Sequence, residues 1–508
     1  MAIAVAFTLM GAFFMAGLYV AGAIGVLSLI LMSAFSEAPL WDVLHFKAWS
    51  TYTDWDWVAI PLFILMGELV LRSGMAEKMY SSLSRWVALL PGGLLHTNIV
   101  SSALFAACAG STIATAATIS RVALPSFRSR GYNERIVLGS LAAGGTLGVL
   151  IPPSILLLIY ALSTGQSIPR MFLAGFVPGF MIAGVFMVMM GTASVIWPGI
   201  APREHEGALW DKAAWRERII AILPMLPMFA LIVIVLGTIY TDVFVPSEAA
   251  AAGATGAFFL AVAHKSGFLV RRLLLGLVSK SWIGWFLPWA IRGSLWAALG
   301  GNEQTPGQLG PMFKDAVGEN IQMLGLAFLS SVRTTSMIML ILMAAFTLQF
   351  AFARLGISNE IGQWVSGLDL SPVQLVLVLV VFYLLLGTFM ESYSMIFVTL
   401  PLLLPTLRDT GVDLFWFGII LVILFELAQI SPPQGMALYV LQGARREINT
   451  ASPGPDGDAI STGVGTGTIV DVYIGVLPFI ACMLIVLGLL IAFPEIVTWF
   501  PNLVKGKL

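Results

Sequence analysis

The sequence predicts an all-α polytopic membrane protein with inverted structural repeats. The first observation is composition: of 508 residues, 58% are hydrophobic and only 10% are charged, whereas soluble proteins carry roughly 25% charged residues. The second is an internal repeat marked by two Pro-Pro pairs. A net charge of −1 leaves no basic surface for a nucleic acid. Composition therefore excludes a soluble globular chain, and the repeat predicts how the helices are organised.

Membrane-spanning helices should account for most of the chain. A helix needs about 20 apolar residues to cross the hydrocarbon core. Because the chain is apolar from Ala2 onward and shows no basic leader, we expect its start to be a first membrane segment and not a signal peptide. The expected spans are residues 3–20, 22–36, 57–72, 136–163, 172–196, 219–241, 247–264, 334–354, 412–443 and 469–493.

Two further apolar blocks are predicted to be re-entrant helical hairpins. Residues 92–127 are interrupted by AGST at 109–112, and residues 371–406 are interrupted around Gly387-Thr388. Each half is roughly 15 to 18 residues long, which is marginal for a crossing. Non-helical backbone at membrane depth is tolerated only where protein or water surrounds it. We therefore expect each block to turn at its small or polar residues and return to its own side.

The hairpins belong to an internal repeat. The only two Pro-Pro pairs of the chain begin at Pro152 and Pro432, and the single prolines Pro125 and Pro405 precede them by equal spacings. The shift that carries Pro152 onto Pro432, here called the repeat offset, also aligns LPSFRSRG (124–131) with LPTLRDTG (404–411). Prolines that merely end helices would not share their spacing across a whole unit.

Both Pro-Pro pairs lie inside apolar runs, GGTLGVLIPPS (144–154) and ELAQISPPQG (426–435). Proline removes a backbone N–H and clashes with the carbonyl four residues back. We therefore expect helices interrupted midway, over 136–163 and 412–443, with free carbonyls at each break. Transporters hold Na⁺ and anionic substrates at such breaks near the bilayer midplane.

The basic residues predict the orientation. With the N-terminus outside and each span crossing once, most Lys and Arg residues fall in cytoplasmic loops, as the positive-inside rule requires. The first hairpin then opens from the cytoplasm and the second from the far side, so the repeats are inverted. Outside lie Lys47, Arg170, Arg354, Arg408, Lys505 and Lys507, while Arg292, Lys314 and Arg333 stay unassigned.

Two polar stretches interrupt this pattern. Residues 265–333 must start and end inside, either as two crossings or as an interfacial excursion, and the sequence leaves both open. Residues 449–468 are rich in Gly, Ser, Thr and Pro and are predicted to form a flexible cytoplasmic loop.

Several motifs resemble the large, DctM-like membrane subunit of tripartite ATP-independent periplasmic (TRAP) transporters. In order, they are IPLFILMGELVLRSG (60–74), AGSTIATAATI (109–119), IPPSILLLIY (151–160), PSEAAAAGA (246–254), SPPQG (431–435) and FPEIVTWFP (493–501). The resemblance covers roughly residues 1–265 and 334–501. The chain departs from the family pattern at Gln434, where an apolar residue is usual, at Ser247, where Thr is usual, and in a longer insert around 281–330.

The resemblance implies an elevator-type ion-transporter fold in the bacterial inner membrane, importing an organic acid with Na⁺ as coupling ion and no organic cofactor. It also implies two partners, a small four-helix membrane subunit and a soluble periplasmic substrate-binding protein. The expected scaffold comprises residues 1–91 and 172–370, the expected transport unit comprises 92–171 and 371–448, and a C-terminal helix occupies 469–508.

Candidate site residues lie at the hairpin tips and the helix breaks. Hydroxyl and carbonyl oxygens at both tips suit Na⁺, because hard cations prefer oxygen ligands. The alternative is that the small residues at the tips only permit close helix packing. Carboxylates in apolar runs are functional by default, yet Glu391 and Glu426 would be structural if paired with Arg408 or a backbone N–H. The first repeat offers Gly110, Ser111, Thr112, Thr115, Thr146, Pro152, Pro153 and Ser154. The second offers Gly387, Thr388, Glu391, Ser392, Glu426, Ser431, Pro432, Pro433 and Gln434.

Three alternatives stay open. The first is a stand-alone Na⁺- or H⁺-coupled carboxylate carrier without a binding protein, which dependence on a soluble partner would distinguish. The second is a membrane-embedded enzyme, for which the sequence offers no nucleophile–base pair, no H-E-x-x-H and no phosphate-binding loop. The third is a channel, which two inverted repeats with midplane breaks disfavour. We expect a transporter and no catalytic residues.

Overall fold

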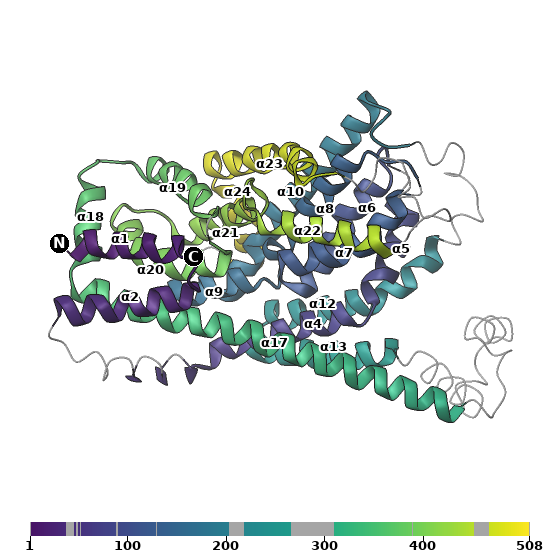
Figure 1. The fold of residues 1–508 in the computed structure, drawn as a ribbon, viewed down its shortest axis with the longest axis horizontal. Helices are drawn as coiled ribbons and strands as arrows, with labels where there is room; N and C mark the ends of the chain where they lie inside the picture. The colour runs from purple at the N-terminus through teal and green to yellow at the C-terminus, as the bar shows by residue number, and fades with distance from the viewer. Residues whose placement is uncertain are drawn as a thin grey trace.

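The computed structural model describes residues 2–36, 45–46, 49–50, 52–87, 90–128, 130–202, 218–265, 309–388, 390–451 and 467–506. Every regular element within these ranges is a helix, as the composition predicted. The helices form an elongated bundle (Figure 1). Most of the insert (266–308) and of the expected flexible loop (452–466) lies outside the described residues.

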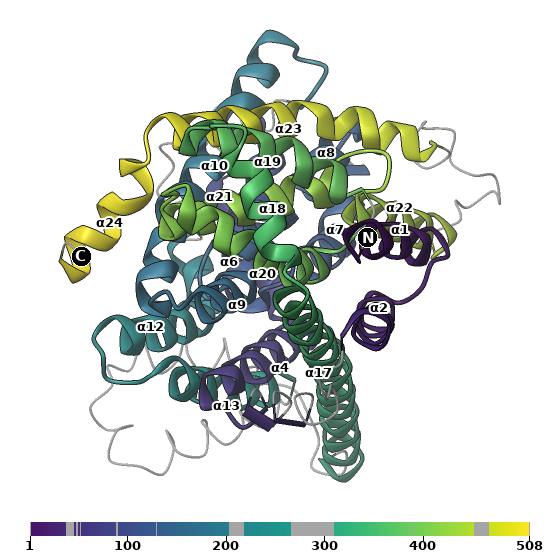
Figure 2. The same cartoon turned by 90° about the vertical axis from the view of Figure 1, so that its left-hand side faces the viewer.

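One layer of the bundle consists of N-terminal and central helices. Its members are α1 (Ala2–Met15), α2 (Val20–Phe35), η1 (Trp55–Val58), α4 (Ala59–Arg72), α12 (Leu226–Tyr240), α13 (Pro246–Lys265) and α17 (Leu309–Arg354). Helices α2 and α4 pack along α17, and α13 packs on α4 (Figure 2). Gly253 permits this last approach, since a Cβ there would lie 2.7 Å from the sulfur of Met66. Small residues at helix contacts are usual within membranes.

Two four-helix repeats pack against this layer. The first contains α6 (Leu94–Ala109), α7 (Thr112–Arg128), α8 (Glu134–Leu150) and α9 (Ile155–Thr164), and the second contains α19 (Pro372–Leu386), α20 (Ser392–Asp409), α21 (Leu414–Ile430) and α22 (Met436–Ala451). The repeat offset carries the starts of α7 and α8 onto those of α20 and α21, as the proline spacing predicted. The α6–α7 hairpin lies toward one end of the bundle and α19–α20 toward the other (Figure 1), which is the inverted arrangement.

The first helix of each hairpin is too short to cross alone. Helix α6 has 16 residues and α19 has 15, which at about 1.5 Å per residue gives roughly 24 Å. The hydrocarbon core is about 30 Å thick. Both hairpins are therefore re-entrant, as predicted from their interrupted apolar runs.

Equivalent local signals start the interrupted helices. The side chains of Asn133 and Asp413 accept hydrogen bonds from the N–H of the second helical residue, at 3.1 and 2.8 Å. Such caps satisfy N–H groups that have no partner within the helix. The preceding turns use Gly131 and Gly411, with φ of +73° and +72°. The repeat therefore extends to the caps and the turns.

Helix α5 (Met75–Val87) connects the first layer to the first repeat. It leaves α4 at a bend of 68°. The buried Tyr80 hydroxyl donates to Asn98 Oδ1 on α6 at 3.0 Å, and Asn98 Nδ2 donates to Ser140 Oγ on α8 at 2.9 Å. This buried polar chain fixes α5 against both a hairpin and an interrupted helix.

The remaining helices cover the repeats. They are α10 (Ile168–Ile196), α18 (Ile357–Ser366), α23 (Ile469–Ala492) and α24 (Glu495–Lys505). Helix α10 packs on α8 and α9, and α23 packs on α8 and α10. The α8–α23 contact needs two glycines, because a Cβ at Gly139 would collide with the carbonyl of Gly475, and one at Gly475 with the carbonyl of Arg135.

Two expected boundaries are wrong. Helix α17 is continuous over 46 residues, so residues 309–333 extend the span that was expected to begin at residue 334. Helix α22 continues to Ala451, into the stretch expected to be a loop. Helix α22 continues as polar turns beyond its apolar part. In α17, residues 321–332 are themselves largely apolar, and the expected span stopped short of them at Arg333, through which the helix continues.

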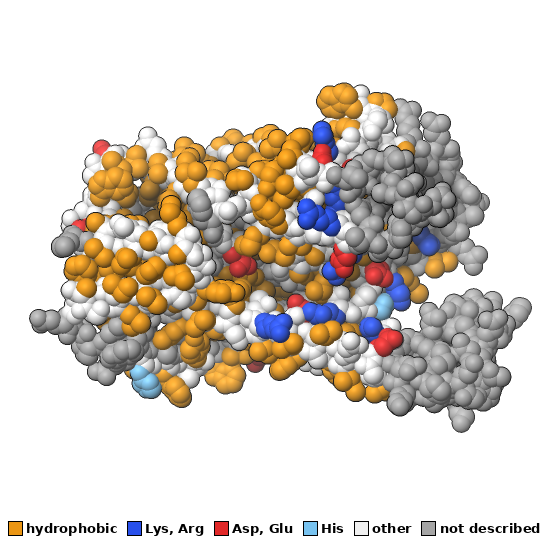
Figure 3. Space-filling model, in the orientation of Figure 1, with side chains coloured by type: hydrophobic (Ala, Val, Ile, Leu, Met, Phe, Trp, Pro, Cys, Tyr) orange, Lys and Arg blue, Asp and Glu red, His pale blue; other side chains and the backbone are white. Residues whose placement is uncertain are grey.

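The described part of the chain is that of a multi-pass membrane protein. Five helices are long and apolar enough to cross, or six if the bent α4–α5 pair counts as one span. This is fewer than the ten expected spans, partly because α1, α2 and α21 are shorter apolar helices. On the face in Figure 3, Lys and Arg gather toward one end of a largely hydrophobic surface. The Lys505–Asp242 ion pair at 2.5 Å joins two segments that the expected topology places on the same side.

Candidate cation and substrate site

The first hairpin turns at Gly110 and Ser111. Gly110 ends α6 with a φ of +59°, a left-handed conformation that glycine adopts without a Cβ penalty. A Cβ there would lie 3.2 Å from the Ile155 side chain. Ser111 Oγ accepts a long hydrogen bond from the Ala114 N–H at 3.4 Å. The tip therefore lies beside the interruption of its own repeat.

The second hairpin turns between Gly387 and Glu391, so its break is longer than the Gly387-Thr388 step expected. Gly387 ends α19 so close to α21 that a Cβ would collide with the methyl group of Ala428. The Thr388 hydroxyl donates to the Leu385 carbonyl at 2.7 Å. Glu391 occupies the N-cap position of α20, and its side chain makes no capping bond.

Helix α21 contacts both tips. The Thr112 hydroxyl, on the first residue of α7, donates to Glu426 Oε2 at 2.7 Å. Gln429 Nε2 donates to Ser392 Oγ, on the first residue of α20, at 3.0 Å. Thr112 and Ser392 are equivalent positions of the repeat, and Glu426 and Gln429 are three residues apart, hence on one face of α21. One helix face thus holds the tips of both hairpins.

Three buried side-chain oxygen atoms on α7 and α21 have no hydrogen-bond partner among the described residues. They are Glu426 Oε1, Gln429 Oε1 and Thr115 Oγ1, the last one turn beyond Thr112 on α7. The Glu426 residue is only 1% exposed, and no Lys, Arg or His of the described residues lies within ion-pair distance of its carboxylate. A buried carboxylate without a counter-charge is costly. Hydroxyl, amide and carboxylate oxygens are the ligand types that a hard cation prefers.

The first helix break is buried. Ser154 caps α9, accepting from the Leu157 N–H at 3.2 Å and donating to the Val149 carbonyl. Pro152 and Pro153 beside it are also buried. The Thr146 hydroxyl, predicted to belong to the site, donates to the Ala143 carbonyl at 2.7 Å and lies 4.0 Å from the Met483 sulfur. The structure does not join Thr146 to either tip.

The second break is more open. Ser431 donates to the Leu427 carbonyl at 2.7 Å, Pro432 is half-buried, and Pro433 and Gln434 are exposed. The Pro433 carbonyl accepts from the hydroxyls of Tyr473 at 2.6 Å and Tyr439 at 3.0 Å. The expectation of a free carbonyl is therefore wrong at Pro433, because α22 and α23 supply donors that the sequence did not place there.

Gln429 is the contact that sequence reasoning missed. Its signal was an amide in an apolar helix, one turn after Glu426. The partner Ser392 was a candidate, but nothing in the local sequence indicates that α21 reaches both hairpins.

Two inverted hairpins that meet on an interrupted helix define a secondary-transporter permease and not an enzyme. The chain belongs to the family described as "Tripartite ATP-independent periplasmic transporter, DctM component", whose model matches residues 5–496. It is accordingly a multi-pass protein of the bacterial inner membrane.

Named relatives cover nearly the same length. The chain is 28% identical to the C4-dicarboxylate TRAP transporter large permease protein DctM of Rhodobacter capsulatus, over 98% of each chain. It is 26% identical to the sialic acid TRAP transporter large permease protein SiaM of Vibrio cholerae, over 88% of this chain and 87% of the relative. The Alcanivorax borkumensis YdaH transporter shares the fold, with a TM-score of 0.52, 15% identity and coverage of 88% and 89% of the two chains.

Proposed function

We propose that this permease imports an organic acid across the inner membrane by an elevator movement coupled to a Na⁺ gradient. The observation that carries the proposal is the buried Glu426 carboxylate, which accepts from Thr112 of the first tip and whose other oxygen has no partner in the described part of the chain. A cation at that oxygen would offset the buried charge and stabilise the tip against α21. Na⁺ binding and tip closure are then one event, which is what coupling requires.

The cargo is proposed to be a small organic anion. Relatives are named for C4-dicarboxylate, sialic acid and isethionate, which are all anions at neutral pH. The helices that begin at the tips, α7 at Thr112 and α20 at Ser392, present N-terminal N–H groups and partial positive charge. These ends favour an anion near the cation site.

The layered arrangement supports an elevator movement. Helices α2, α4, α13 and α17 form one layer by their mutual contacts, and the two repeats pack on each other through α7, α8, α21 and α22. The two groups meet where α17 packs on α20 and α4 packs on α6. We propose that the first group is the static scaffold and the second the moving carrier. In the family's tripartite scheme, a small four-helix membrane subunit would extend the scaffold and a periplasmic binding protein would deliver the cargo.

The test is uptake of labelled organic acids into proteoliposomes under an inward Na⁺ gradient, with and without both partners. Uptake that requires Na⁺ and all three components is expected. The variant Glu426→Gln is expected to lose at least 100-fold in Na⁺-driven rate, while Glu447→Gln, which removes a 64% exposed carboxylate on α22, keeps it. Equal uptake without a Na⁺ gradient would contradict the coupling. Uptake by the chain alone would support the stand-alone carrier instead.

A further inference from the structure

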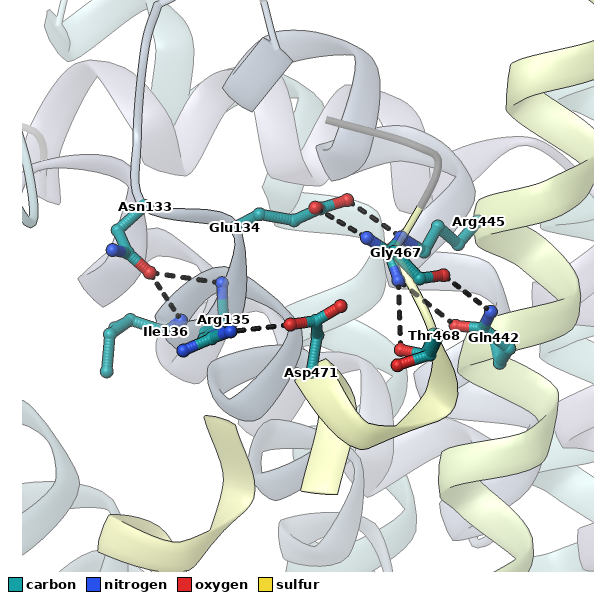
Figure 4. A network of polar contacts seen from close by, with 9 residues as sticks. All are labelled: Asn133, Glu134, Arg135, Ile136, Gln442, Arg445, Gly467, Thr468 and Asp471. Atoms are coloured by element: carbon teal, nitrogen blue, oxygen red, sulfur yellow. Dashed lines mark hydrogen bonds and ion pairs between the residues drawn. The ribbon is translucent and has the colours of Figure 1, made fainter. Parts of the chain in front are cut away.

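A polar cluster lies away from the hairpin tips, where the start of α8 meets the second half of α22 (Figure 4). Arg445 of α22 has only 1% of its side chain exposed. Its Nε and Nη2 donate to the two carboxylate oxygens of Glu134, the first residue of α8, at 2.8 and 2.6 Å. Its Nη1 donates to Gln442 Oε1 at 3.3 Å and to the Thr468 carbonyl at 3.4 Å. One guanidinium therefore joins both repeats and the residues that precede α23.

A second ion pair flanks the first. Arg135 Nε donates to Asp471 Oδ1 at 2.9 Å and ties α8 to α23, but the Arg135 side chain is 54% exposed. Gly467 packs against the Arg445 guanidinium so closely that a Cβ would lie 2.8 Å from Nη1. The two pairs differ in burial and in what they join, since Glu134–Arg445 connects the two repeats whereas Arg135–Asp471 connects α8 to α23.

A matching contact lies at the opposite end of the interrupted helices. The Tyr160 hydroxyl of α9 donates to the carbonyl of Leu414, the first residue of α21, at 2.6 Å. Gly418 gives the ring room, since a Cβ there would lie 2.7 Å from Tyr160 Cδ1. At the repeat offset, Leu414 is the counterpart of Glu134. Each second-half helix, α9 or α22, thus bonds to the first residue of the other repeat's first-half helix.

We propose that Glu134 and Arg445, together with Tyr160, are positioning residues that clamp the two interrupted helices to each other throughout the transport cycle. The clamp makes the two repeats one moving body. The site needs this, because the Thr112–Glu426 bond joins the tip of one repeat to the helix of the other. A bidentate pair fixes direction as well as distance, so it preserves that register. The inference rests on the proposed transport function.

The decisive experiment is a reversible cross-link across the clamp. Cys108 and Cys482, the buried thiols, are first replaced by alanine. Glu134→Cys and Arg445→Cys are then joined by a bifunctional methanethiosulfonate reagent that spans the gap left by the two side chains. Cross-linked protein is expected to retain at least half of the uptake of the reduced sample. Loss of uptake that returns on reduction would overturn the proposal, because it would show that the clamp must open.

A control cross-link separates this outcome from failure of the proposed function. Ala345 of α17 and Leu400 of α20 line one small cavity between the proposed scaffold and carrier. Joining cysteines at these two positions is expected to stop uptake. Persistent uptake after this cross-link would refute the elevator movement and would not bear on the clamp proposal, which its own cross-link decides, so the two failures are distinguishable. Uptake driven by H⁺ instead of Na⁺ would change the coupling ion, and the cross-link across the clamp would then be assayed in the same way under an H⁺ gradient.

Charge variants provide a second measurement. Glu134→Gln and Gly467→Ala are each expected to raise the Na⁺ concentration for half-maximal uptake at least tenfold, because they loosen the register of tip and helix. The double exchange Glu134→Arg with Arg445→Glu is expected to restore part of the original Na⁺ dependence. Arg135→Gln is the matched control, and it is expected to change the Na⁺ concentration for half-maximal uptake little. A fall in maximal rate or protein amount with an unchanged Na⁺ dependence would show a merely structural role and contradict the proposal.

Discussion

The Glu426 side chain places a carboxylate within an apolar helix at membrane depth. Its Oε2 accepts from the Thr112 hydroxyl, and its Oε1 has no partner within the ranges that the structure describes. Intramembrane carboxylates face bundle interiors or cavities and mark ion pathways. The hydroxyl of Thr112 is therefore expected to orient the carboxylate for its ligand, which makes the pair testable from the threonine side.

Thr112→Val removes the hydroxyl and keeps the shape of the side chain. A hydrogen bond to a charged group contributes about 1.5–3 kcal/mol, so half-maximal uptake is expected to need at least tenfold more Na⁺. Na⁺ titration of uptake measures this. Thr118→Val, at a half-buried position two turns from Thr112 on the same helix, is the control. An unchanged Na⁺ requirement in Thr112→Val would remove Glu426 from the cation site.

Arg445 and Arg135 offer a matched comparison of buried and exposed ion pairs. Arg445→Met leaves the Glu134 carboxylate without its partner and is expected to cost about 3–5 kcal/mol in the free energy of unfolding. Arg135→Met breaks a half-exposed pair and is expected to cost about 1 kcal/mol or less. Unfolding in detergent, followed for both variants, measures the difference. Equal losses would mean that Arg445 is less enclosed than the structure shows.

At the scale of elements, close backbone approach decides how the helices meet. Gly139 with Gly475 brings α8 against α23, and Gly387 brings α19 against Ala428 of α21. Lipid chains are as apolar as the side chains, so the hydrophobic effect does not hold helices together within the membrane. Close packing at small residues and interhelical hydrogen bonds stabilise the association instead. The contact at Gly387 matters most for function, because it sets the distance from the second tip to Gln429.

Gly387→Ala is expected to push α19 away from α21 and cost about 1–3 kcal/mol through overpacking. Uptake is expected to fall, because the Ser392–Gln429 bond at 3.0 Å would be displaced with the tip. Gly237→Ala on α12, where a Cβ would meet no atom within 4 Å, is the control. The measurements are uptake rate and thermal stability, and full uptake in Gly387→Ala would contradict the close packing.

At the scale of the whole molecule, the repeats impose an inverted topology. Arg130 and Thr410 are equivalent positions at the repeat offset, each next to the turn that precedes an interrupted helix. The positive-inside rule places the first in the cytoplasm and the second outside. Opposite sides for equivalent positions are the defining property of an inverted repeat.

Single cysteines at Arg130 and Thr410, in a chain without Cys108 and Cys482, test this directly. In intact cells, a membrane-impermeant thiol reagent is expected to label Thr410→Cys and leave Arg130→Cys unlabelled. Permeabilised cells are the control, in which both cysteines are expected to react. Labelling of both in intact cells would refute the inverted arrangement.

Much of this organisation was predictable because its causes are local. Apolar run length, proline pairs and glycine turns act over one or two helical turns. The same local signals occur in both repeats, at positions related by the repeat offset, as Pro152 and Pro432 are. The expected start of α17 and the expected end of α22 were wrong, because the prediction stopped at Arg333 and Gly443, whereas both helices continue through these residues. Thr112, Ser392 and Glu426 were selected from the sequence as polar residues at or near the breaks, and their role in a binding site stays a prediction. The sequence did not indicate which partners they contact.

The sequence by itself determined the membrane class, both hairpins, both interruptions and the inverted repeat, because each depends on chemistry between near neighbours. Only the tertiary structure decided the pairings: Thr112 with Glu426 across 314 positions, and Glu134 with Arg445 across 311. Such bonds depend on how whole helices cross, which the glycine contacts and the bundle set together. A local pattern indicates which residues are polar in an apolar setting, and packing determines which of them meet.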